Sequence, residues 1–305
     1  MHVFVTGGSG QTGPTVVADL LAAGHTVTGL ARSEASATKL RALGAAVHEG
    51  SLDDLDSLRR GAAAADGVLH MGYGGDFAKP EEMMRRDINA IDTFGQVLEG
   101  TGKPLIITSG TLVMPLNRLS DETDEPLADG IAGFRVAGER ACLALAARGV
   151  RAIVVRLAPT VHGPHDHGFI PMLIATARKS GVSAYVDDGA NRWPAVQRQD
   201  AAQLFRLALE KAPAGSVLHG VAETGIAFKD IAETIGQGLG LPTASLTKDQ
   251  AATHYVSPFM GMLYGVDAPV SSIRTQQLLG WTPTREGLLQ DLRHGDYLTV
   301  DEEHA

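Results

Sequence analysis

The sequence predicts an α/β fold, a doubly wound parallel sheet with a smaller C-terminal lobe. In the first half of the 305 residues, short runs rich in Val, Ile and Leu alternate with segments of helical periodicity. This alternation is typical of a parallel sheet whose two faces are both covered by helices. Beyond Pro164 the alternation weakens and polar and turn residues become frequent, so we expect a second unit there.

We expect the first half of the chain to contribute six strands to the main sheet. Right-handed crossovers between successive strands would make the sheet doubly wound. The expected strands cover residues 2–6, 25–31, 45–50, 66–72, 103–110 and 151–157, and the helices cover about 15–24, 35–43, 54–64, 80–99 and 132–148.

The second half contains fewer regular elements. DAAQLFRLALEKA is amphipathic and predicts a helix over 200–212, and SVLHGVA at 216–222 is interpreted as a late strand that rejoins the main sheet. Further helices are expected at FKDIAETIGQGLG and SIRTQQLLG.

These elements predict two structural units that exchange segments. The first comprises residues 1–165 plus about 196–222, and the C-terminal lobe comprises 166–195 plus 223–305. We expect a substrate to bind in the cleft between them. The closing residues 301–305 are expected to be a solvated tail.

Composition argues against several classes of function. The formal net charge is -9 without a Lys/Arg cluster, which argues against nucleic-acid binding. No apolar run approaches the roughly 18 residues of a membrane span, and the N-terminus lacks the features of a signal peptide, so a cytoplasmic protein is expected. Cys142 is the single cysteine. It can form no intramolecular disulfide, and its setting predicts a buried helix residue. No metal site is expected in the protein.

The opening stretch TGGSGQTG places three glycines between the first strand and the first helix. Gly7 permits a tight turn, Gly10 lets a pyrophosphate approach the backbone, and Gly13 lets the helix pack closely on the strand. The N–H groups of the following helix would face the phosphates. This context predicts a dinucleotide-binding (Rossmann) domain, with Ser9, Gln11 and Thr12 also contacting the cofactor.

The end of the second strand bears on which dinucleotide binds. An NAD site calls for a carboxylate there to hold the ribose hydroxyls, and none stands at the expected place. Arg32 can pair with a 2′-phosphate and Ser33 can donate a hydrogen bond. Arg32 as a solvated loop residue, with Glu34 nearby, is the alternative. We predict NADP in preference to NAD.

Further motifs give the chain a resemblance to the extended branch of the short-chain dehydrogenase/reductase superfamily, the epimerase and dehydratase group. The resemblance extends over nearly the whole chain and implies that Asp53 contacts the adenine and that Met71 and Gly72 lie beside the cofactor. Matching segments are TGGSGQTG, Gly50–Asp53, Leu69–Gly72, Asn89–Thr93, Arg156–Pro164, and Asp188–Gly189 through Asp200–Ala201.

The family's catalytic pair, Tyr-x-x-x-Lys, is absent. Placing Glu139 on the family's downstream glutamate puts Ile131 at the tyrosine position and Arg135 at the lysine position, and another register puts Arg135 and Glu139 there. Ser109 and Thr111 can supply the family's hydroxyl. This departure resembles the atypical members of the superfamily.

The catalytic residues are therefore expected to be Ser109 and Thr111, which would orient a substrate oxygen, and Arg135, which would stabilise its negative charge. Arginine does not readily release a proton, so water or another side chain must supply it. Histidines 162, 165 and 167, with Asp166 to orient one of them, are candidates; polar loop residues without a catalytic role are the alternative.

Other polar residues have a structural and a functional interpretation. Tyr73 lies in a loop that Gly72, Gly74 and Gly75 could make mobile, and it either reaches the active site, covers the cofactor or packs. Arg192 and Trp193 either clamp a ligand or pack. Asp87 and Asp92 are expected to cap a helix start near Asn89, and a catalytic aspartate there is the alternative.

Three functions remain open from the sequence. The first is an NADP-dependent oxidoreductase acting on a small carbonyl or sugar-like substrate. The second is an epimerase or dehydratase that oxidises its substrate transiently, and the third is a non-catalytic NADP-binding redox sensor. The resemblance also implies a homodimer.

Overall fold

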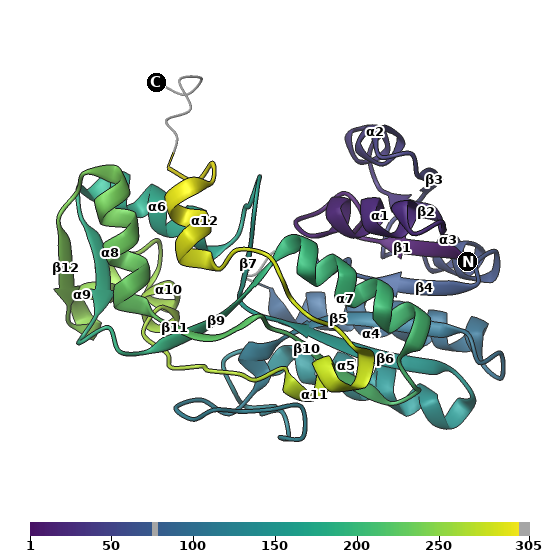
Figure 1. Ribbon diagram of the computed structural model, residues 1–305. Coiled ribbons are helices and arrows are strands. Elements are labelled where there is room, and N and C mark those ends of the chain that lie inside the picture. The colour runs from purple at the N-terminus through teal and green to yellow at the C-terminus, as the bar shows by residue number, and fades with distance from the viewer. Residues whose placement is uncertain (75–78, 299–305) are drawn as a thin grey trace.

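The protein is built around a seven-stranded sheet in which every neighbouring pair of strands is parallel (Figure 1). The computed structural model describes residues 1–74 and 79–298; Gly75 of the expected mobile loop and the expected tail 301–305 lie outside the described residues. The strand order is β10-β6-β5-β4-β1-β2-β3. The strands are β1 (His2–Thr6), β2 (Thr26–Ala31), β3 (Ala46–Glu49), β4 (Gly67–His70), β5 (Pro104–Gly110), β6 (Arg151–Leu157) and β10 (Ser216–Gly220).

The strand order reverses its direction between β1 and β4. In an open α/β sheet, ligands bind at such a switch point, beyond the carboxyl ends of the strands. The fold therefore places Thr6 at the end of β1 and His70 at the end of β4 beside a crevice. The predicted doubly wound sheet is confirmed, and the late strand does rejoin it, as β10 beside β6.

Alternating side chains of each strand bury against helices on opposite faces. Val3 and Val5 of β1 belong to a core shared with α1 and α7, whereas Phe4 between them belongs to a core shared with α3, α4 and α5. This period of two follows from the pleat of a strand. The covering helices are α1 (Gly13–Ala22), α2 (Glu34–Ala42), α3 (Leu55–Ala63), α4 (Pro80–Leu98), α5 (Val136–Ala144) and α7 (Arg198–Lys211).

A second unit lies beside the sheet and has its own hydrophobic core, which includes Trp193 and Phe228 (Figure 1). It contains a three-stranded sheet in the order β11-β9-β7 and a parallel pair, β12-β8. Its elements are β7 (Thr160–His162), α6 (Phe169–Ser180), β8 (Ser183–Val186), β9 (Arg192–Gln197), β11 (Glu223–Ala227), α8 (Phe228–Leu239), β12 (Thr243–Leu246), α9 (Lys248–His254), α10 (Pro258–Leu263) and α12 (Leu288–His294).

One late segment returns to the first unit. Helix α11 (Ile273–Leu279) packs near β10, and Leu279 and Trp281 are buried in the core shared with α1 and α7. The indole N–H of Trp281 donates to the Asp200 carbonyl at 3.0 Å. The two units are therefore joined by several crossings of the chain, and the proposed boundaries between them stay a prediction.

Three local expectations were wrong. The helix expected over 132–148 is divided into a 3₁₀ turn at Gly133–Arg135, α5, and a second 3₁₀ turn at Leu145–Arg148. Residues 160–162, which lie outside the expected strands, form β7 because they pair with β9. Asp87 does not cap a helix: α4 already begins at Pro80, so Asp87 lies inside it, and its carboxylate bonds His70.

Cys142 of α5 is fully buried, as expected, and its thiol faces the carbonyl of Ile153 at 3.8 Å. Burial raises the pKa of this thiol to about 12, so the thiolate is disfavoured in the folded protein. Within residues 1–74 and 79–298, the helices are all too short or too polar to cross a bilayer.

Candidate cofactor and active site

The glycine turn after β1 is packed against the backbone that follows β4. Gly7 has φ of +74°, and a Cβ there would lie 2.7 Å from the backbone nitrogen of Gly72. A Cβ on Gly13 would lie 2.6 Å from the carbonyl carbon of Gly8. These two glycines are needed by the fold itself, since any side chain would collide with main chain.

Gly10 differs from the other two glycines. Among the described residues, a Cβ on Gly10 would meet one atom within 4 Å, the Gly7 oxygen at 3.3 Å. The space beside Gly10 is part of a cleft of about 540 Å³, within the usual range for small-molecule sites. The missing side chain at Gly10 therefore leaves space in the cleft for a ligand, and the packing of the protein does not require it.

The cleft gathers residues from the ends of several strands. Ten of the eleven residues predicted to bind the cofactor line it, and Ser33 lines an adjoining hollow that shares Arg32 with the cleft. The ten are Gly7, Ser9, Gly10, Gln11, Thr12, Gly13, Arg32, Asp53, Met71 and Gly72.

Helix α1 starts in the cleft with Thr12 as its N-cap. The side chain of Thr12 makes no capping hydrogen bond, and Pro14 lies in the first turn. Backbone N–H groups at a helix start have no partner within the helix, and the helix dipole favours an anion there. Together with the room at Gly10, this start fits a pyrophosphate.

Arg32 is an exposed cation at the far end of the cleft. No residue in the described ranges bonds its guanidinium, whereas Glu34 close by is paired with Arg41 at 2.6 Å. The Ser33 hydroxyl accepts from the Ser36 N–H at 3.3 Å and so caps α2. The arrangement leaves Arg32 free to meet an anion.

Asp53, on the loop after β3, is paired with Arg86 of α4 at 3.0 Å. Arg86 also donates to the carbonyl of Gly74 at 2.9 Å. Both side chains border the cleft, so this contact joins its two sides near the end that Arg32 occupies.

At the other end of the cleft, the end of β5 carries buried hydroxyls. The side-chain oxygens of Thr108, Ser109 and Thr111 are buried and have no hydrogen-bond partner in the described structure. Thr108 is among the residues that border the cleft, whereas Ser109 and Thr111, which the sequence favours, are not. The alternation of side chains along β5 was the signal that could have separated Thr108 from Ser109.

Arg135 and Tyr73 meet at this end. The guanidinium carbon of Arg135 lies 3.5 Å from the centre of the Tyr73 ring, and Arg135 also donates to the Thr108 carbonyl. Phe134 stacks on the same ring with centroids 6.2 Å apart. Tyr73 borders the cleft, and its buried hydroxyl lacks a partner with hydrogen-bond geometry among the described residues. Burial raises the pKa of Tyr73, and the positive charge of Arg135 opposes that rise.

A buried hydrogen-bond network supports the loop that carries Tyr73. The Gly72 N–H donates to the Thr6 hydroxyl at 3.1 Å, and this hydroxyl bonds Nδ1 of His70 at 2.6 Å. Nε2 of His70 lies 3.2 Å from the Asp87 carboxylate. If the Thr6 hydroxyl donates to Nδ1, Nε2 carries the proton toward Asp87, which fixes the position of Gly72 against the glycine turn.

Glu139 is engaged elsewhere. Its buried carboxylate accepts two hydrogen bonds from Nε and Nη2 of Arg156, the closer at 2.6 Å. Glu139 is thus not available at the lysine position of the second register. Ile131, at the tyrosine position of the first register, packs against the core of the second unit.

The histidines of the HGPHDHG segment do not form one group. His162 is buried and bonds Asp291 at 2.7 Å, while His165 and His167 are exposed. Asp166 orients none of them and bonds Gln11 of the glycine turn and Tyr297 instead. The segment links the second unit to the glycine turn.

Two other expectations resolve toward packing. Trp193 is buried among aromatic rings, and Arg192 forms a two-point contact with Asp267 at 2.9 Å.

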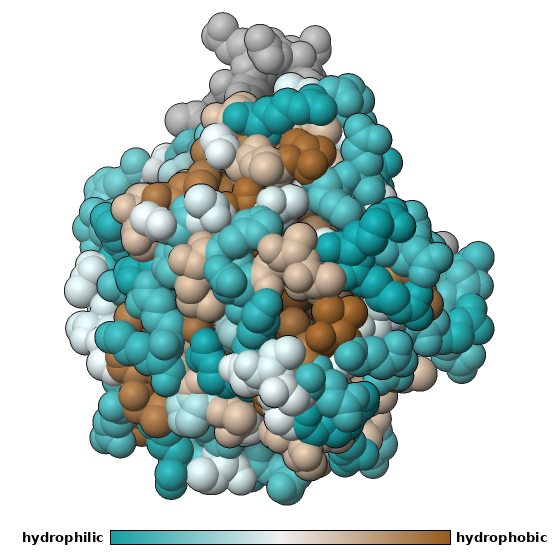
Figure 2. Space-filling view, turned by 90° about the vertical axis from the view of Figure 1, so that its right-hand side faces the viewer, coloured by the Kyte–Doolittle hydropathy of each residue, from teal (hydrophilic) through white to brown (hydrophobic). Residues whose placement is uncertain are grey.

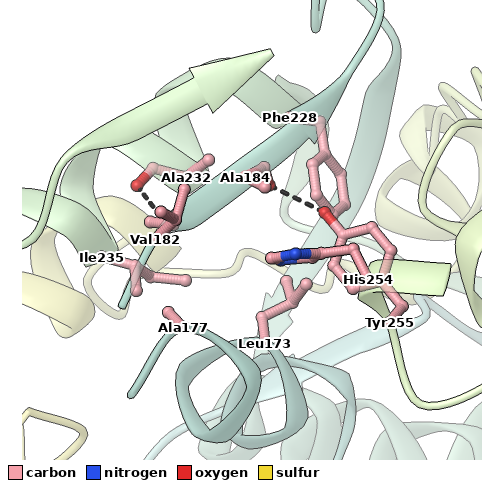
Figure 3. Close-up of a pocket in the computed structure, with 10 residues that line it drawn as sticks. Leu173, Ala177, Val182, Ala184, Phe228, Ala232, Ile235, His254 and Tyr255 are labelled. Atoms are coloured by element: carbon pink, nitrogen blue, oxygen red, sulfur yellow. Dashed lines mark hydrogen bonds between the residues drawn. The ribbon is translucent and has the colours of Figure 1, made fainter. Parts of the chain in front are cut away.

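A separate cavity between α6 and α8 is lined by Leu173, Phe228 and Tyr255 (Figure 3) and has room for about 10 Å³. It holds at most one water molecule. Within the described residues, no cluster of three metal-binding side chains occurs.

The family model described as NAD dependent epimerase/dehydratase family matches residues 3–219. The chain belongs to this family. Its sheet, glycine turn and cleft are therefore those of a family of NAD-dependent proteins, and the resemblance seen in the sequence is confirmed.

Relatives and solved structures agree with this assignment. An uncharacterized protein of Schizosaccharomyces pombe is 48% identical over 298 residues, 97% of this chain and 100% of that one. A 4-hydroxy-2-methyl-3-oxo-4-farnesyl-3,4-dihydroquinoline-1-oxide ketoreductase of Stigmatella aurantiaca is 28% identical over 226 residues, 71% of this chain and 67% of that one. The fold matches a dTDP-glucose 4,6-dehydratase from Streptomyces venezuelae with NAD and TYD bound, at TM-score 0.78, 19% identity and 96% coverage of both chains.

Proposed function

We propose that the protein is an NADP-dependent oxidoreductase that acts on a small carbonyl or sugar-like substrate. The observation that carries the proposal is one continuous cleft. It runs from the unpaired cation of Arg32, past the glycine turn, to the buried hydroxyl of Thr108. A site for a dinucleotide needs anion-binding groups at one end and polar groups for a reacting oxygen at the other.

The residues present fit such a cofactor. Gly10 and the start of α1 would hold the pyrophosphate, and Arg32, with Ser33, would hold the 2′-phosphate. Asp53, Met71 and the other residues bordering the cleft would hold the rest. When bound, the reduced cofactor supplies a hydride.

The chain's own groups would prepare the substrate. In this proposal the hydroxyls of Ser109 or Thr111, or that of Thr108, which borders the cleft, orient the carbonyl oxygen. The guanidinium of Arg135 stabilises the negative charge that develops on it. Arg135 is held for this task by its contacts with the Thr108 carbonyl and the Tyr73 ring.

The family and the dehydratase fold also favour a second candidate, an epimerase or dehydratase that returns the hydride to its substrate. The test is calorimetry with NADPH and NADH, followed by absorbance of the reduced nicotinamide with a panel of aldehydes, ketones and keto-sugars. Net oxidation of NADPH is the expected result. Binding without net oxidation would favour the epimerase or the sensor, and failure to bind either cofactor would refute the proposal.

A further inference from the structure

The structure supplies a phenol where the family's catalytic helix has none. Tyr73 comes from the loop after β4 and borders the cleft, and Arg135 comes from the 3₁₀ turn before α5. The Tyr73 ring is held between the guanidinium of Arg135 at 3.5 Å and the ring of Phe134. The phenol is therefore held in place by contacts on both faces of its ring.

The hydroxyl itself is unusual. It is buried, and no described residue meets it with the geometry of a hydrogen bond, although the Arg135 guanidinium lies close enough to act on it. A buried polar group without a partner is destabilising and calls for an explanation. Because Tyr73 borders the cleft, the missing partner is explained if it is a ligand atom.

Thr108 strengthens this interpretation. Its side-chain oxygen is also buried without a partner in the described structure, and it borders the same cleft. Arg135 joins the two residues, since it stacks on the ring of Tyr73 and donates to the carbonyl of Thr108. Two residues with buried hydroxyls thus border one cleft and contact the same cation, and these are the groups that a carbonyl oxygen needs for hydrogen bonds and a nearby positive charge.

We propose that Tyr73 is the proton donor of the reduction, with Arg135 as the positioning residue that holds its ring. This inference rests on the proposed function. As the carbonyl carbon accepts a hydride from the reduced cofactor, the O–H bond of Tyr73 breaks and its proton goes to the substrate oxygen, giving the alcohol. The phenolate, stabilised by Arg135, then regains a proton from solvent water, so that charge and atoms balance.

Arginine suits the positioning role and not the donor role, because it keeps its proton. A tyrosine is protonated at neutral pH and can give its proton to a forming alkoxide, which is far more basic. The charged groups that act on Tyr73 are Arg135 and, from α4, Asp87. Asp87 is already bonded to His70, which leaves Arg135 as the cation nearest the ring.

The test is Tyr73→Phe, which keeps the ring between Arg135 and Phe134 and removes one oxygen. We expect NADPH to bind with an unchanged Kd in calorimetry. The single-turnover rate of hydride transfer, measured with the best carbonyl substrate of the wild-type protein, should fall about 100-fold or more. Tyr185→Phe, in the second unit and away from the cleft lining, is the matched control and should keep the wild-type rate.

A second readout does not depend on turnover. The near-ultraviolet titration of wild-type protein minus that of Tyr73→Phe isolates the ionisation of Tyr73. Arg135→Met should move that ionisation to higher pH, while the contribution of Tyr185 stays where it is. If the pKa of Tyr73 is the same in the Arg135→Met variant as in the wild-type protein, Arg135 does not stabilise the phenolate and the proposed role of Arg135 is wrong.

The outcomes separate the two proposals. If the wild-type protein reduces a carbonyl and Tyr73→Phe does so within threefold of its rate, Tyr73 is not the donor and the proposed function stands. If the wild-type protein binds NADPH but never oxidises it, the reductase proposal fails, and the role of Tyr73 fails with it.

Discussion

The three glycines of the turn after β1 have different roles although they share one motif. Gly7 and Gly13 are required by the packing of main chain on main chain, whereas Gly10 faces the open cleft. A substitution at Gly13 is therefore a change in stability, and a substitution at Gly10 is a change in binding. The distinction can be measured because the two effects appear in different experiments.

We expect Gly10→Ala to change the free energy of unfolding by less than about 1 kcal/mol and to weaken NADP binding about tenfold or more, since its methyl occupies space meant for the phosphates. Gly13→Ala should lower the free energy of unfolding by about 1–3 kcal/mol, because its Cβ meets the backbone of Gly8. Urea denaturation and calorimetry check both. A Gly10 variant with normal affinity would contradict the cofactor assignment.

Arg32 decides between the two dinucleotides. A hydrogen bond to a charged group contributes about 1.5–3 kcal/mol, so Arg32→Ala should weaken NADP binding about 10- to 100-fold and leave NAD binding unchanged. Arg59→Ala, an exposed arginine paired with Asp56, is the control. Equal loss of both cofactors would show that Arg32 does not read the 2′-phosphate.

At the level of elements, α5 is tied to β6 by charge inside an apolar core. Glu139 and Arg156 are almost fully buried, and Nη1 of Arg156 also reaches Sδ of Met114 at 3.0 Å. The desolvation of both ions is offset by their mutual contacts, so each needs the other. The helix that lacks the family's catalytic pair is thus still anchored firmly to the sheet.

Glu139→Ala should lower the free energy of unfolding by about 3–5 kcal/mol, because it leaves the Arg156 guanidinium buried without its carboxylate. The exposed pair of Glu34 and Arg41 provides the comparison: Glu34→Ala should cost less than about 1 kcal/mol. Denaturant titration measures both variants. Similar losses of unfolding free energy in the two variants would mean that the buried pair of Glu139 and Arg156 contributes little to stability.

The sheet and its helices were predictable because period and turn chemistry are local properties. The alternation of Val3, Phe4 and Val5 and the glycine turn can be read directly along the chain. The division of 132–148 and the strand at 160–162 could not be predicted, since both depend on partners distant in sequence. The encounter of Tyr73 with Arg135 is of the same kind: 62 positions separate them, and tertiary packing brings them together.

At the scale of the whole molecule, the two units are held together by polar contacts as well as by the chain. Asp166 accepts a hydrogen bond from Gln11 of the glycine turn, and the His167 N–H donates to the same side chain at 3.0 Å. On the face seen in Figure 2, hydrophobic residues lie among hydrophilic ones.

A buried histidine links the stability of the whole fold to pH. His219 of β10 is fully buried, its Nδ1 lies 2.9 Å from the Ser271 carbonyl, and Nη1 of Arg156 faces its Nε2. Burial lowers the pKa of His219 below its ordinary value of 6.5. At a pH below 6.5, His219 therefore binds a proton more readily in the unfolded chain than in the folded protein.

The free energy of unfolding should accordingly be highest above pH 6.5 and decrease as the pH falls below it, by at most about 1.4 kcal/mol per pH unit for this group. His219→Gln should reduce that slope between pH 6.5 and 5. Burial also lowers the pKa of His254, so His254→Gln serves as the comparison. Denaturation curves at several pH values measure the slopes, and an unchanged slope in the His219 variant would contradict the assignment.

Because Cys142 is buried, the reactivity of its thiol can report local unfolding of the protein. With a single sulfhydryl sealed behind α5, a thiol reagent in excess should remain unconsumed by native protein and react one-to-one once the region around β6 loosens. The rate of that reaction then reports how often the sheet and α5 separate, with no label added. A rapid reaction under native conditions would mean that this part of the molecule opens far more readily than its packing implies.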